Sequence, residues 1–322
     1  MNQSVVNPYL SGDDQVSKKY REMLYSCLDI LDDYATPTQL RKLKKELQLG
    51  GSTFNEAKFL QAACETSVAA SIASSFPQTF VYEPKLNPPS DVDCSFSYNG
   101  FKFNIEVKCP DFTKAHAQQE RNTFNIGAFG RMPEFKDTAK MLSDLFESKG
   151  NAFEVQPHMD NKLKDYLLSA QKKFSSEVKS KELNVLLVCC DTAMDMQKWF
   201  HYMYGMQGLL TPESFYNPLE YERVDVVILT NLYHRHYSYK DKLKIEDHWS
   251  FGKAFNLIFK NRSLNKGKDE VIWALVDTIP NFSREIVDYL SSLQEIEKHF
   301  AIPMFVRSKL NADKQCYFEP KT

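Results

Sequence analysis

An Asn-Gly dipeptide at positions 99 and 100 separates two runs of alternating apolar and polar residues. Alternation with a period of two is typical of β-strands, and Asn-Gly between such runs is the strongest short signal for a two-residue hairpin turn. A turn at this dipeptide sets the pairing, so that Tyr98 lies opposite Phe101 and Asp93 lies opposite Glu106. The sequence therefore predicts a β-hairpin with a defined register.

The two faces of this hairpin differ in polarity, because successive side chains of a strand point to opposite faces. The first face is apolar and carries Val92, Cys94, Phe96, Tyr98, Phe101, Phe103, Ile105 and Val107. The second face is polar and carries Asp91, Asp93, Ser95, Ser97, Lys102, Asn104, Glu106 and Lys108. We expect the apolar face to lie in the core and the polar face to form a functional site. The alternative is a polar face that simply contacts solvent.

Asp93 and Glu106 are expected to place two carboxylates opposite each other, with Cβ atoms about 4.5 to 5.5 Å apart. Because like charges at this spacing repel, we expect a cation between them. Mg²⁺ takes carboxylate oxygens as ligands, keeps several waters and is commonly completed by substrate phosphate oxygens. Lys108 projects from the same face, where its ammonium is placed to hold or deprotonate a water or to neutralise charge on a phosphate. This set predicts hydrolysis of a phosphodiester.

A segment rich in Ala and Ser precedes the hairpin and is predicted to form a helix that ends near Phe76-Pro77. Thr53 and Glu56 have the spacing of a capping box at its start. The helix neighbours of Glu65, three and four positions away, are Gln61, Ala62, Val68 and Ala69. A carboxylate in this setting is costly unless it meets a cation, so Glu65 is expected to join the site. A boundary glutamate that reaches water is the alternative.

The order of a helix bearing Glu65, a strand, a strand bearing Asp93 and a strand bearing Glu106-Val107-Lys108 resembles the PD-(D/E)XK nuclease superfamily, which has the restriction-endonuclease-like fold. The core of that family runs helix, three strands, helix, strand, and this order corresponds to residues of about 54 to 190. The resemblance implies a Mg²⁺-dependent endonuclease, for which Mn²⁺ can substitute, that hydrolyses phosphodiester bonds in DNA. It also implies Asp93, Glu106 and Glu65 as metal ligands and Lys108 as the catalytic lysine.

The sequence departs from the family pattern before the aspartate. A proline often precedes that aspartate directly, whereas here Pro88-Pro89 is followed by Ser90-Asp91-Val92-Asp93. Asp91 is therefore a rival for the motif position, and Asp93 is preferred because it faces Glu106. Asp91 is then expected to pair with Lys108 or to line the rim of the site as a substrate-binding residue.

Gln171 and Lys172 are further candidate substrate-binding residues. Together with Lys173, they lie on the predicted helix before the buried strand at 183–190, where related enzymes often place residues that orient substrate or water. The alternative is a solvated helix face. A second E-x-K tripeptide, Glu177-Val178-Lys179, shows that the tripeptide by itself carries little weight.

Composition narrows the class of protein without indicating its function. A chain of 322 residues with 43% hydrophobic residues is typical of a well-packed globular protein, and a net charge of −2 neither requires nor excludes a nucleic-acid partner. The longest apolar run has six residues, far short of a membrane span, and no leader is visible. Seven cysteines without a C-x-x-C pair favour a reducing cytoplasm over a disulfide framework or a zinc finger. Neither a glycine-rich nucleotide loop nor a G-x-S-x-G elbow is present.

The fold class expected from the whole chain is α/β. Residues 1–52 are predicted to form a helical N-terminal extension, with a capping box at Thr36 and Gln39, and residues 53–191 a restriction-endonuclease-like core. Residues 192–322 are predicted to form a C-terminal α/β extension of the sheet or a substrate-shaping lobe. Individual predictions are strands at 79–82, 183–190, 224–230 and 271–276, and helices at 137–147, 161–179 and 283–300.

Three clusters of basic residues remain open to more than one interpretation. Arg41, Lys42, Lys44 and Lys45 form either a solvated helix face or a phosphate-contacting one. His234-Arg235-His236 is interpreted as a surface loop, as a loop that touches nucleic-acid backbone with Tyr233 and Tyr237 stacking on bases, or as a metal-binding doublet. The stretch with Lys260, Arg262, Lys266 and Lys268 favours a solvated turn over a phosphate track.

The function expected from these residues is Mg²⁺-dependent cleavage of nucleic acid, with DNA preferred, and a homodimer is compatible because cutting both strands requires two sites. Replacing Asp93 or Glu106 by its amide is expected to weaken Mg²⁺ binding and to stabilise the metal-free protein by relieving repulsion. The alternative function is that of a catalytically inactive nuclease-fold protein that acts as a nucleic-acid-binding or scaffolding subunit. A third possibility is an α/β interaction protein with an accidental E-x-K.

Overall fold

The computed structural model describes residues 7–50, 53–112, 124–126, 140–141, 144–145, 153–155, 159–177, 179–263, 267–294, 297–313 and 317–318. The chain divides into two compact units, one made of residues 1–110 and 166–322 and the other of residues 111–165. The smaller unit contains a parallel pair of short strands, β4 (Phe124–Ile126) and β5 (Phe153–Val155). Most of the helix predicted at 137–147 lies outside the described residues, and the predicted three-part domain division stays a prediction.

The larger unit is built on an open, mixed six-stranded sheet, so the α/β class is confirmed. Its strands are β1 (Val81–Tyr82), β2 (Cys94–Tyr98), β3 (Phe101–Lys108), β6 (Glu182–Cys189), β7 (Val226–Thr230) and β8 (Asn256–Lys260), in this spatial order. Pairing is antiparallel from β1 to β3, parallel from β3 to β7 and antiparallel between β7 and β8. The strand β3 is therefore interior to the sheet, with β2 on one side and β6 on the other.

The hairpin of β2 and β3 has the predicted register. Tyr98 pairs with Phe101, and the ladder continues to the pair of Cys94 and Ile105. Asn99 and Gly100 both have positive φ, 50° and 77°, as a two-residue turn that matches the right-handed twist of the strands requires. The turn residues and the alternating pattern therefore agree, and this part of the sequence prediction is confirmed.

The N-terminal helices are α1 (Gln15–Asp32), α2 (Pro37–Glu46) and α3 (Glu56–Ser75). The capping box of Thr36 and Gln39 starts α2 as predicted. The N-cap of α3, however, is Asn55 and not Thr53, because the Asn55 side chain accepts the backbone N–H of Lys58 at 2.9 Å. The helix ends one residue before Phe76, as expected from the proline that follows.

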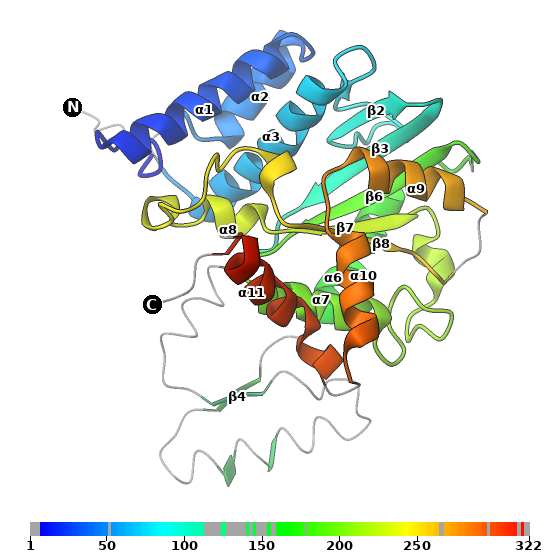
Figure 1. The fold of residues 1–322 in the computed structure, drawn as a ribbon. Helices are drawn as coiled ribbons and strands as arrows, with labels where there is room; N and C mark the ends of the chain where they lie inside the picture. The colour runs from blue at the N-terminus through cyan, green and yellow to red at the C-terminus, as the bar shows by residue number, and fades with distance from the viewer. Residues whose placement is uncertain are drawn as a thin grey trace. The chain divides into compact units, whose positions relative to one another are not determined.

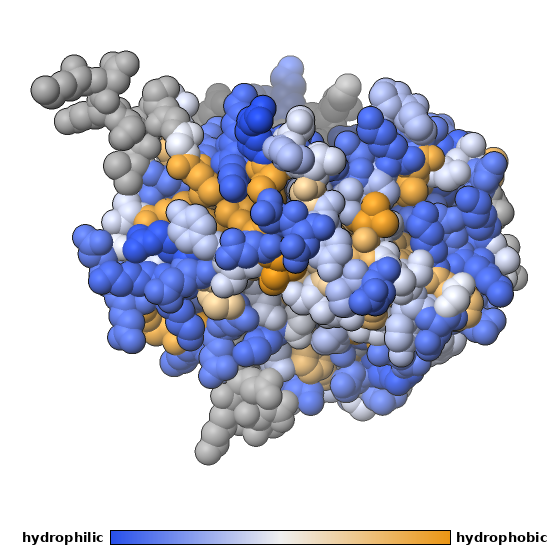
Figure 2. Space-filling model, turned by 90° about the horizontal axis from the view of Figure 1, so that it is seen from above, coloured by the Kyte–Doolittle hydropathy of each residue, from blue (hydrophilic) through white to orange (hydrophobic). Residues whose placement is uncertain are grey.

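Helices cover both sides of the sheet of the larger unit. The helices α1, α2 and α3 lie on one side, and α7 (Ala193–Tyr204), α10 (Ser283–Ser292) and α11 (Ala301–Asp313) lie on the other (Figure 1). Phe76, at the end of α3, stacks on Phe96 of β2 with ring centroids 4.5 Å apart, so the predicted apolar face of the hairpin packs in the core. Seen from above, hydrophilic residues cover most of the surface and hydrophobic residues lie in separate patches between them (Figure 2).

The polar face of the hairpin is covered as well. Ser95, Asn104 and Glu106 are each at most 1% exposed, so the alternative of a polar face open to solvent is wrong. Asn104 donates both to Oε1 of Glu182 and to Oδ1 of Asn184, at 2.8 Å each, which compensates for part of its burial. Polar residues buried in this way require specific partners, and those of Glu106 define the candidate site.

The C-terminal half differs from the sequence prediction in two places. Residues 271–276 belong to the helix α9 (Asp269–Thr278) and not to a strand, and the last strand of the sheet is β8. In α9, Val271 and Leu275 are buried while Trp273 is 55% exposed, which is the period of a helix packed on one side. The single helix predicted at 283–300 is divided into α10, a short 3-10 helix at Glu297–Phe300 and the start of α11.

Candidate catalytic site

The four predicted catalytic residues line one cavity of about 170 Å³ in the larger unit. Glu65 comes from α3, Asp93 from the residue before β2, and Glu106 and Lys108 from β3. The cavity is also lined by Lys42, Glu46, Gln61, Ala69, Tyr82, Glu83, Asp91 and Lys173. The structure thus brings together the predicted carboxylates and lysine from separate elements, with Asp91 at the same cavity.

Glu106 lies at the centre of the ionic contacts of this site. Its side chain is fully buried, and its Oε1 lies 2.6 Å from Nζ of Lys108 and 2.7 Å from Nζ of Lys173. Its other oxygen, Oε2, is buried and has no hydrogen-bond partner among the described residues. An ionised carboxylate buried in this way is tolerable only with cationic partners, and the two ammonium groups provide them at one oxygen.

Asp93 lies next to the hairpin ladder, just beyond its last pair. Its Oδ2 accepts the backbone N–H of Val107 at 2.5 Å, which places the carboxylate beside β3. Burial raises the pKa of Asp93 well above its usual range, and the negative charges of Glu106 and Glu65 raise it further. The negative charges of Asp93 and Glu106 therefore disfavour each other, as expected from the sequence.

Glu65 is partly buried on the side of α3 that meets the cavity. Its Oε1 accepts from Nε2 of Gln61 at 2.9 Å, one helical turn earlier. Burial raises the pKa of Glu65 to about 7, and Glu46 and Glu106 add to this rise, whereas Gln61 and Lys108 act against it. Glu65 is thus a carboxyl group that changes charge near neutral pH and belongs to the same electrostatic cluster as Glu106.

Lys173, at the end of α6 (Met159–Lys173), contacts Glu106, although the sequence favoured its neighbours Gln171 and Lys172 as the candidates on this helix. Burial opposes its charge, but Glu106 and Asp93 outweigh burial and raise the pKa of Lys173. The neighbouring candidates do not line the cavity. Gln171 accepts the backbone N–H of Arg223 through Oε1 at 2.7 Å. The side chain of Lys172 is exposed, and its carbonyl accepts from Asn87.

The residues of this cavity suit Mg²⁺ in part. Across the described ranges, no three His, Cys, Asp or Glu side chains are gathered closely enough to hold a metal ion, so Asp93, Glu106 and Glu65 do not form a preformed cage. Mg²⁺ is commonly held by only one or two carboxylates together with waters and substrate phosphates. Two carboxylates of the cavity can act as such ligands. Oε2 of Glu106 has no hydrogen-bond partner among the described residues, and the negative charge of Asp93 is unfavourable without a cation. The donor chemistry therefore fits a Mg²⁺ ion that binds with its substrate.

The helix α2 carries four basic side chains, one of which lines the cavity. Lys42 lines it and pairs with Glu83, with Nζ 2.9 Å from Oε1. Arg41, Lys44 and Lys45 are exposed, and they are spaced three and four residues apart on one face of the helix. Arg41, Lys44 and Lys45 therefore form an exposed cationic face on the helix whose Lys42 lines the cavity.

The segment His234-Arg235-His236 is a buried helix, and its interpretation as a surface loop is wrong. It forms most of α8 (Leu232–His236), which packs against α3. His236 is fully buried between the hydroxyl of Tyr20, 2.8 Å from Nδ1, and Oγ of Ser67, 2.9 Å from Nε2. Because Ser67 already donates to the carbonyl of Ala63, it accepts from Nε2, and Tyr20 donates to Nδ1.

The basic stretch after β8 is also partly internal. Lys268, predicted on a solvated turn, is buried and donates to Oδ2 of Asp225 at 2.9 Å and to the carbonyl of Glu182 at 2.8 Å. A lysine held in this way is a structural cation and not part of a phosphate track.

Comparison of the chain with protein-family models, with curated proteins and with solved structures gave no match in any of the three. Among the helices that the structure describes, none is both long and apolar enough to span a lipid bilayer.

Proposed function

We propose that this protein is a Mg²⁺-dependent nuclease that hydrolyses phosphodiester bonds in DNA. The single observation that carries the proposal is the cavity shared by Glu65, Asp93, Glu106 and Lys108. Three carboxyl groups and a lysine from three separate segments are costly to gather in a partly buried place, and a stability-driven fold avoids such clusters. A metal-dependent site for phosphodiester cleavage combines anionic metal ligands with a cation in this way.

The order of elements around the cavity supports a restriction-endonuclease-like core. The helix, three strands, helix and strand expected for that family correspond to α3, β1, β2, β3, α6 and β6. Glu65, Asp93 and the Glu106-Val107-Lys108 tripeptide occupy the first helix, the start of the second strand and the third strand of this order. This order of elements and residues supports the proposed resemblance.

Asp93 and Glu106, with Glu65 beside them, are the residues that would hold the ion. When bound, Mg²⁺ supplies Lewis acidity and lowers the pKa of a water molecule. Lys108 is attached to Glu106 by a single 2.6 Å contact and remains 18% exposed, so its ammonium can orient a water or meet a phosphate oxygen. Lys173, on α6, contacts the same oxygen of Glu106 at 2.7 Å and contributes a second positive charge there.

The size of the cavity indicates which part of a substrate enters it. Pockets that enclose drug-sized ligands measure about 300 to 1,000 Å³, and a cavity of about 170 Å³ is too small for a whole nucleotide. A backbone phosphate fits while the rest of the strand lies outside. The exposed Arg41, Lys44 and Lys45 of α2 are then available to contact neighbouring phosphates.

The second candidate function is that of a catalytically inactive nucleic-acid-binding subunit. The observation that favours it is that Lys108 and Lys173 both contact Oε1 of Glu106. These two ammonium groups balance the charge of the carboxylate without a metal ion. Such a protein would bind DNA through its basic side chains and leave it uncut.

Incubation with supercoiled plasmid and with single-stranded DNA, in Mg²⁺ or in EDTA, tests the proposal. We expect degradation that requires Mg²⁺ and that falls by at least about 100-fold in Lys108→Ala, since loss of a charge-stabilising group costs about 3 kcal/mol in the transition state. Lys102→Ala is the matched control, because Lys102 lies on the same strand but pairs with Glu182 outside the cavity. Binding of DNA without metal-dependent cleavage by the wild-type chain would favour the inactive subunit and refute the nuclease.

A further inference from the structure

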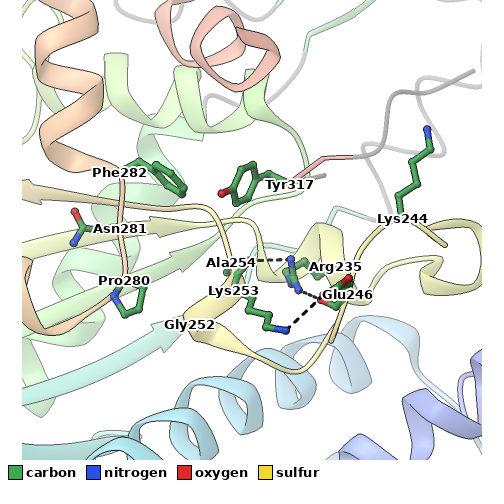
Figure 3. Close-up of a pocket in the computed structure, with 10 residues that line it drawn as sticks. All are labelled: Arg235, Lys244, Glu246, Gly252, Lys253, Ala254, Pro280, Asn281, Phe282 and Tyr317. Atoms are coloured by element: carbon green, nitrogen blue, oxygen red, sulfur yellow. Dashed lines mark hydrogen bonds and ion pairs between the residues drawn. The ribbon is translucent and has the colours of Figure 1, made fainter. Parts of the chain in front are cut away.

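A second and larger cavity, of about 560 Å³, lies in the same unit (Figure 3). Its lining comes from α8, from the segment between α8 and β8, from the loop before α10 and from Tyr317. It shares no lining residue with the candidate catalytic cavity. Its volume lies within the range of about 300 to 1,000 Å³ that is typical of small-molecule sites.

One part of this cavity is cationic. Arg235 and Lys253 lie together with the carboxylate of Glu246, while Lys244 also lines the cavity but its ammonium points away from this group (Figure 3). That carboxylate is 85% exposed and lies 3.8 Å from Nζ of Lys253, which is itself 57% exposed. An exposed and loose ion pair is strongly screened, so it leaves Lys253 available for an anionic ligand. The lining therefore carries a net positive charge, which favours an anionic ligand.

Another part of the cavity is aromatic. The rings of Phe282 and Tyr317 meet edge to face with centroids 5.1 Å apart, and both side chains are only partly buried. Phe255, which is fully buried, stacks on Phe282 at 5.1 Å. Figure 3 shows Phe282 and Tyr317 beside each other, with Arg235 and Lys253 on another side of the pocket. The rings of Phe282 and Tyr317 form an apolar surface on which a planar ring of a ligand can pack.

Buried polar side chains hold the walls of the cavity in place. Arg235 donates through Nη2 to the carbonyls of Glu246 and Asp247, at 2.6 Å each, and through Nη1 to that of Lys253 at 3.1 Å. Asn256 donates through Nδ2 to the carbonyls of Phe251 and Pro280. These bonds join the segments that line the cavity, so the site is largely formed before any ligand binds, and preorganisation favours affinity.

We propose that this cavity binds a nucleoside monophosphate, with the base against Phe282 and Tyr317 and the phosphate toward Lys253 and Arg235. The volume suits one nucleotide, the phosphate matches the excess of positive charge, and the aromatic pair offers a stacking surface. The nucleotide is either free or the phosphorylated end of a nucleic-acid strand, since the same groups recognise both. This site stands apart from the proposed nuclease function and does not depend on it.

Calorimetric titration of the full chain in EDTA tests the site without cleavage. Adenosine 5′-monophosphate is expected to bind at least tenfold more tightly than adenosine or inorganic phosphate, because each of these lacks half of the contacts. Lys253→Gln and Tyr317→Leu should each weaken binding of the monophosphate at least fivefold. Lys240→Gln, which removes an exposed lysine that does not line the cavity, should leave it unchanged.

A short single-stranded oligonucleotide, with or without a 5′-phosphate, identifies the source of the ligand. Tighter binding of the phosphorylated oligonucleotide than of the free monophosphate indicates a strand end, and the reverse order indicates a free nucleotide. Thermal unfolding checks that each variant is folded, and Lys253 is an exposed position at which the fold should tolerate the change. No binding of the monophosphate, or equal binding by wild type and a folded Lys253→Gln, overturns the proposal.

Discussion

Nζ of Lys173 lies 2.7 Å from Oε1 of Glu106, the same oxygen that Lys108 contacts at 2.6 Å. Two ammonium groups thus share one oxygen of a fully buried carboxylate, while the second oxygen has no partner among the described residues. This arrangement explains how the acidic cluster is tolerated without an ion. It also implies that a metal ion at Glu106 must compete with these lysines.

Asp93 and Glu106 should respond in opposite ways to replacement by their amides. Glu106→Gln leaves two ammonium groups without their shared counter-ion, so we expect a loss of about 2 to 3 kcal/mol in metal-free unfolding free energy, somewhat less than for a fully buried pair. Asp93→Asn keeps an oxygen to accept from Val107 and removes a disfavoured charge, so we expect a gain of about 1 kcal/mol. The relief of repulsion expected from sequence thus applies to one partner only.

Urea unfolding in EDTA at pH 7.5 measures both changes. Asp91→Asn is a suitable control, since Asp91 lines the same cavity and no ion pair holds it among the described residues. Equal shifts of the same sign for Asp93→Asn and Glu106→Gln would show that the lysine contacts do not stabilise Glu106.

Lys173→Ala should make the site easier to load with Mg²⁺. Removing one of two cations from Glu106 lowers the cost of ion binding, and we expect the Mg²⁺ concentration for half-maximal cleavage to fall about threefold to tenfold, which corresponds to about 0.7 to 1.4 kcal/mol. A Mg²⁺ titration of plasmid cleavage measures it. Lys172→Ala, one residue earlier and exposed, should not change the titration. A higher Mg²⁺ requirement in Lys173→Ala would indicate that Lys173 helps bind substrate instead.

The hairpin and its site residues are predictable from the sequence because their signals are local. Asn99-Gly100 sets the turn, and the period of two sets which side chains share a face with Glu106. Lys173 is not predictable in this way, because Gln171, Lys172 and Lys173 follow one another on a helix. The one that meets Glu106 depends on the rotation of α6 about its axis. Long-range packing of its buried residues, Leu167 and Ala170, and of Phe174 sets that rotation.

The C-terminal half shows a second limit of sequence reasoning. A six-residue apolar run at 271–276 is compatible with a buried strand or with a helix that is apolar on most sides, and periodicity does not separate the two. Asp269 and Glu270 in the first turn are a helix-start signal that outweighs the run. His236 has no local signal at all, because its partners Tyr20 and Ser67 come from α1 and α3.

Neutralising the basic face of α2 should weaken DNA binding and its dependence on salt. The triple change Arg41→Gln, Lys44→Gln and Lys45→Gln removes up to three phosphate contacts, so the slope of log K against log salt should become shallower by about 2 to 3. Fluorescence anisotropy with labelled DNA in EDTA at several salt concentrations measures the slope. The control triple Lys198→Gln, Arg284→Gln and Arg307→Gln, on α7, α10 and α11, should keep the wild-type slope. An unchanged slope in the α2 variant would indicate that these three side chains contact solvent and not DNA.

Glu65 should destabilise the metal-free protein more at high pH than at low pH. Its pKa in the fold is about 7, above the usual value of 4.5, so folding favours the protonated form and this advantage is lost as the pH rises through 7. We therefore expect Glu65→Gln to stabilise the protein by about 1 to 2 kcal/mol more at pH 8.5 than at pH 5.5, after allowance for partial exposure. Urea unfolding in EDTA at the two pH values measures the difference, and the exposed Glu177→Gln should show none.

His236 should make the fold sensitive to acid. Burial lowers the pKa of His236 well below 6.5, and the nearby His248, Arg235 and Lys242 lower it further, so the folded protein keeps the ring neutral. The unfolded chain takes up a proton below about pH 6.5, so this contribution to stability is present above that pH and is lost as the pH falls. Each pH unit below 6.5 should then cost up to about 1.4 kcal/mol for this group alone.

The variant His236→Gln separates this contribution from those of other groups that titrate in acid. Glutamine can accept from Tyr20 and donate to Ser67 without binding a proton, so the slope of unfolding free energy against pH between 6.5 and 5 should fall by about 1 kcal/mol per pH unit. The absolute stability of the variant is lower, because the amide does not fill the volume of the ring beside Trp249, but only the slope reports on the proton. Equal slopes in the two proteins would mean that the imidazole is protonated inside the fold, with Tyr20 and Ser67 both accepting from it.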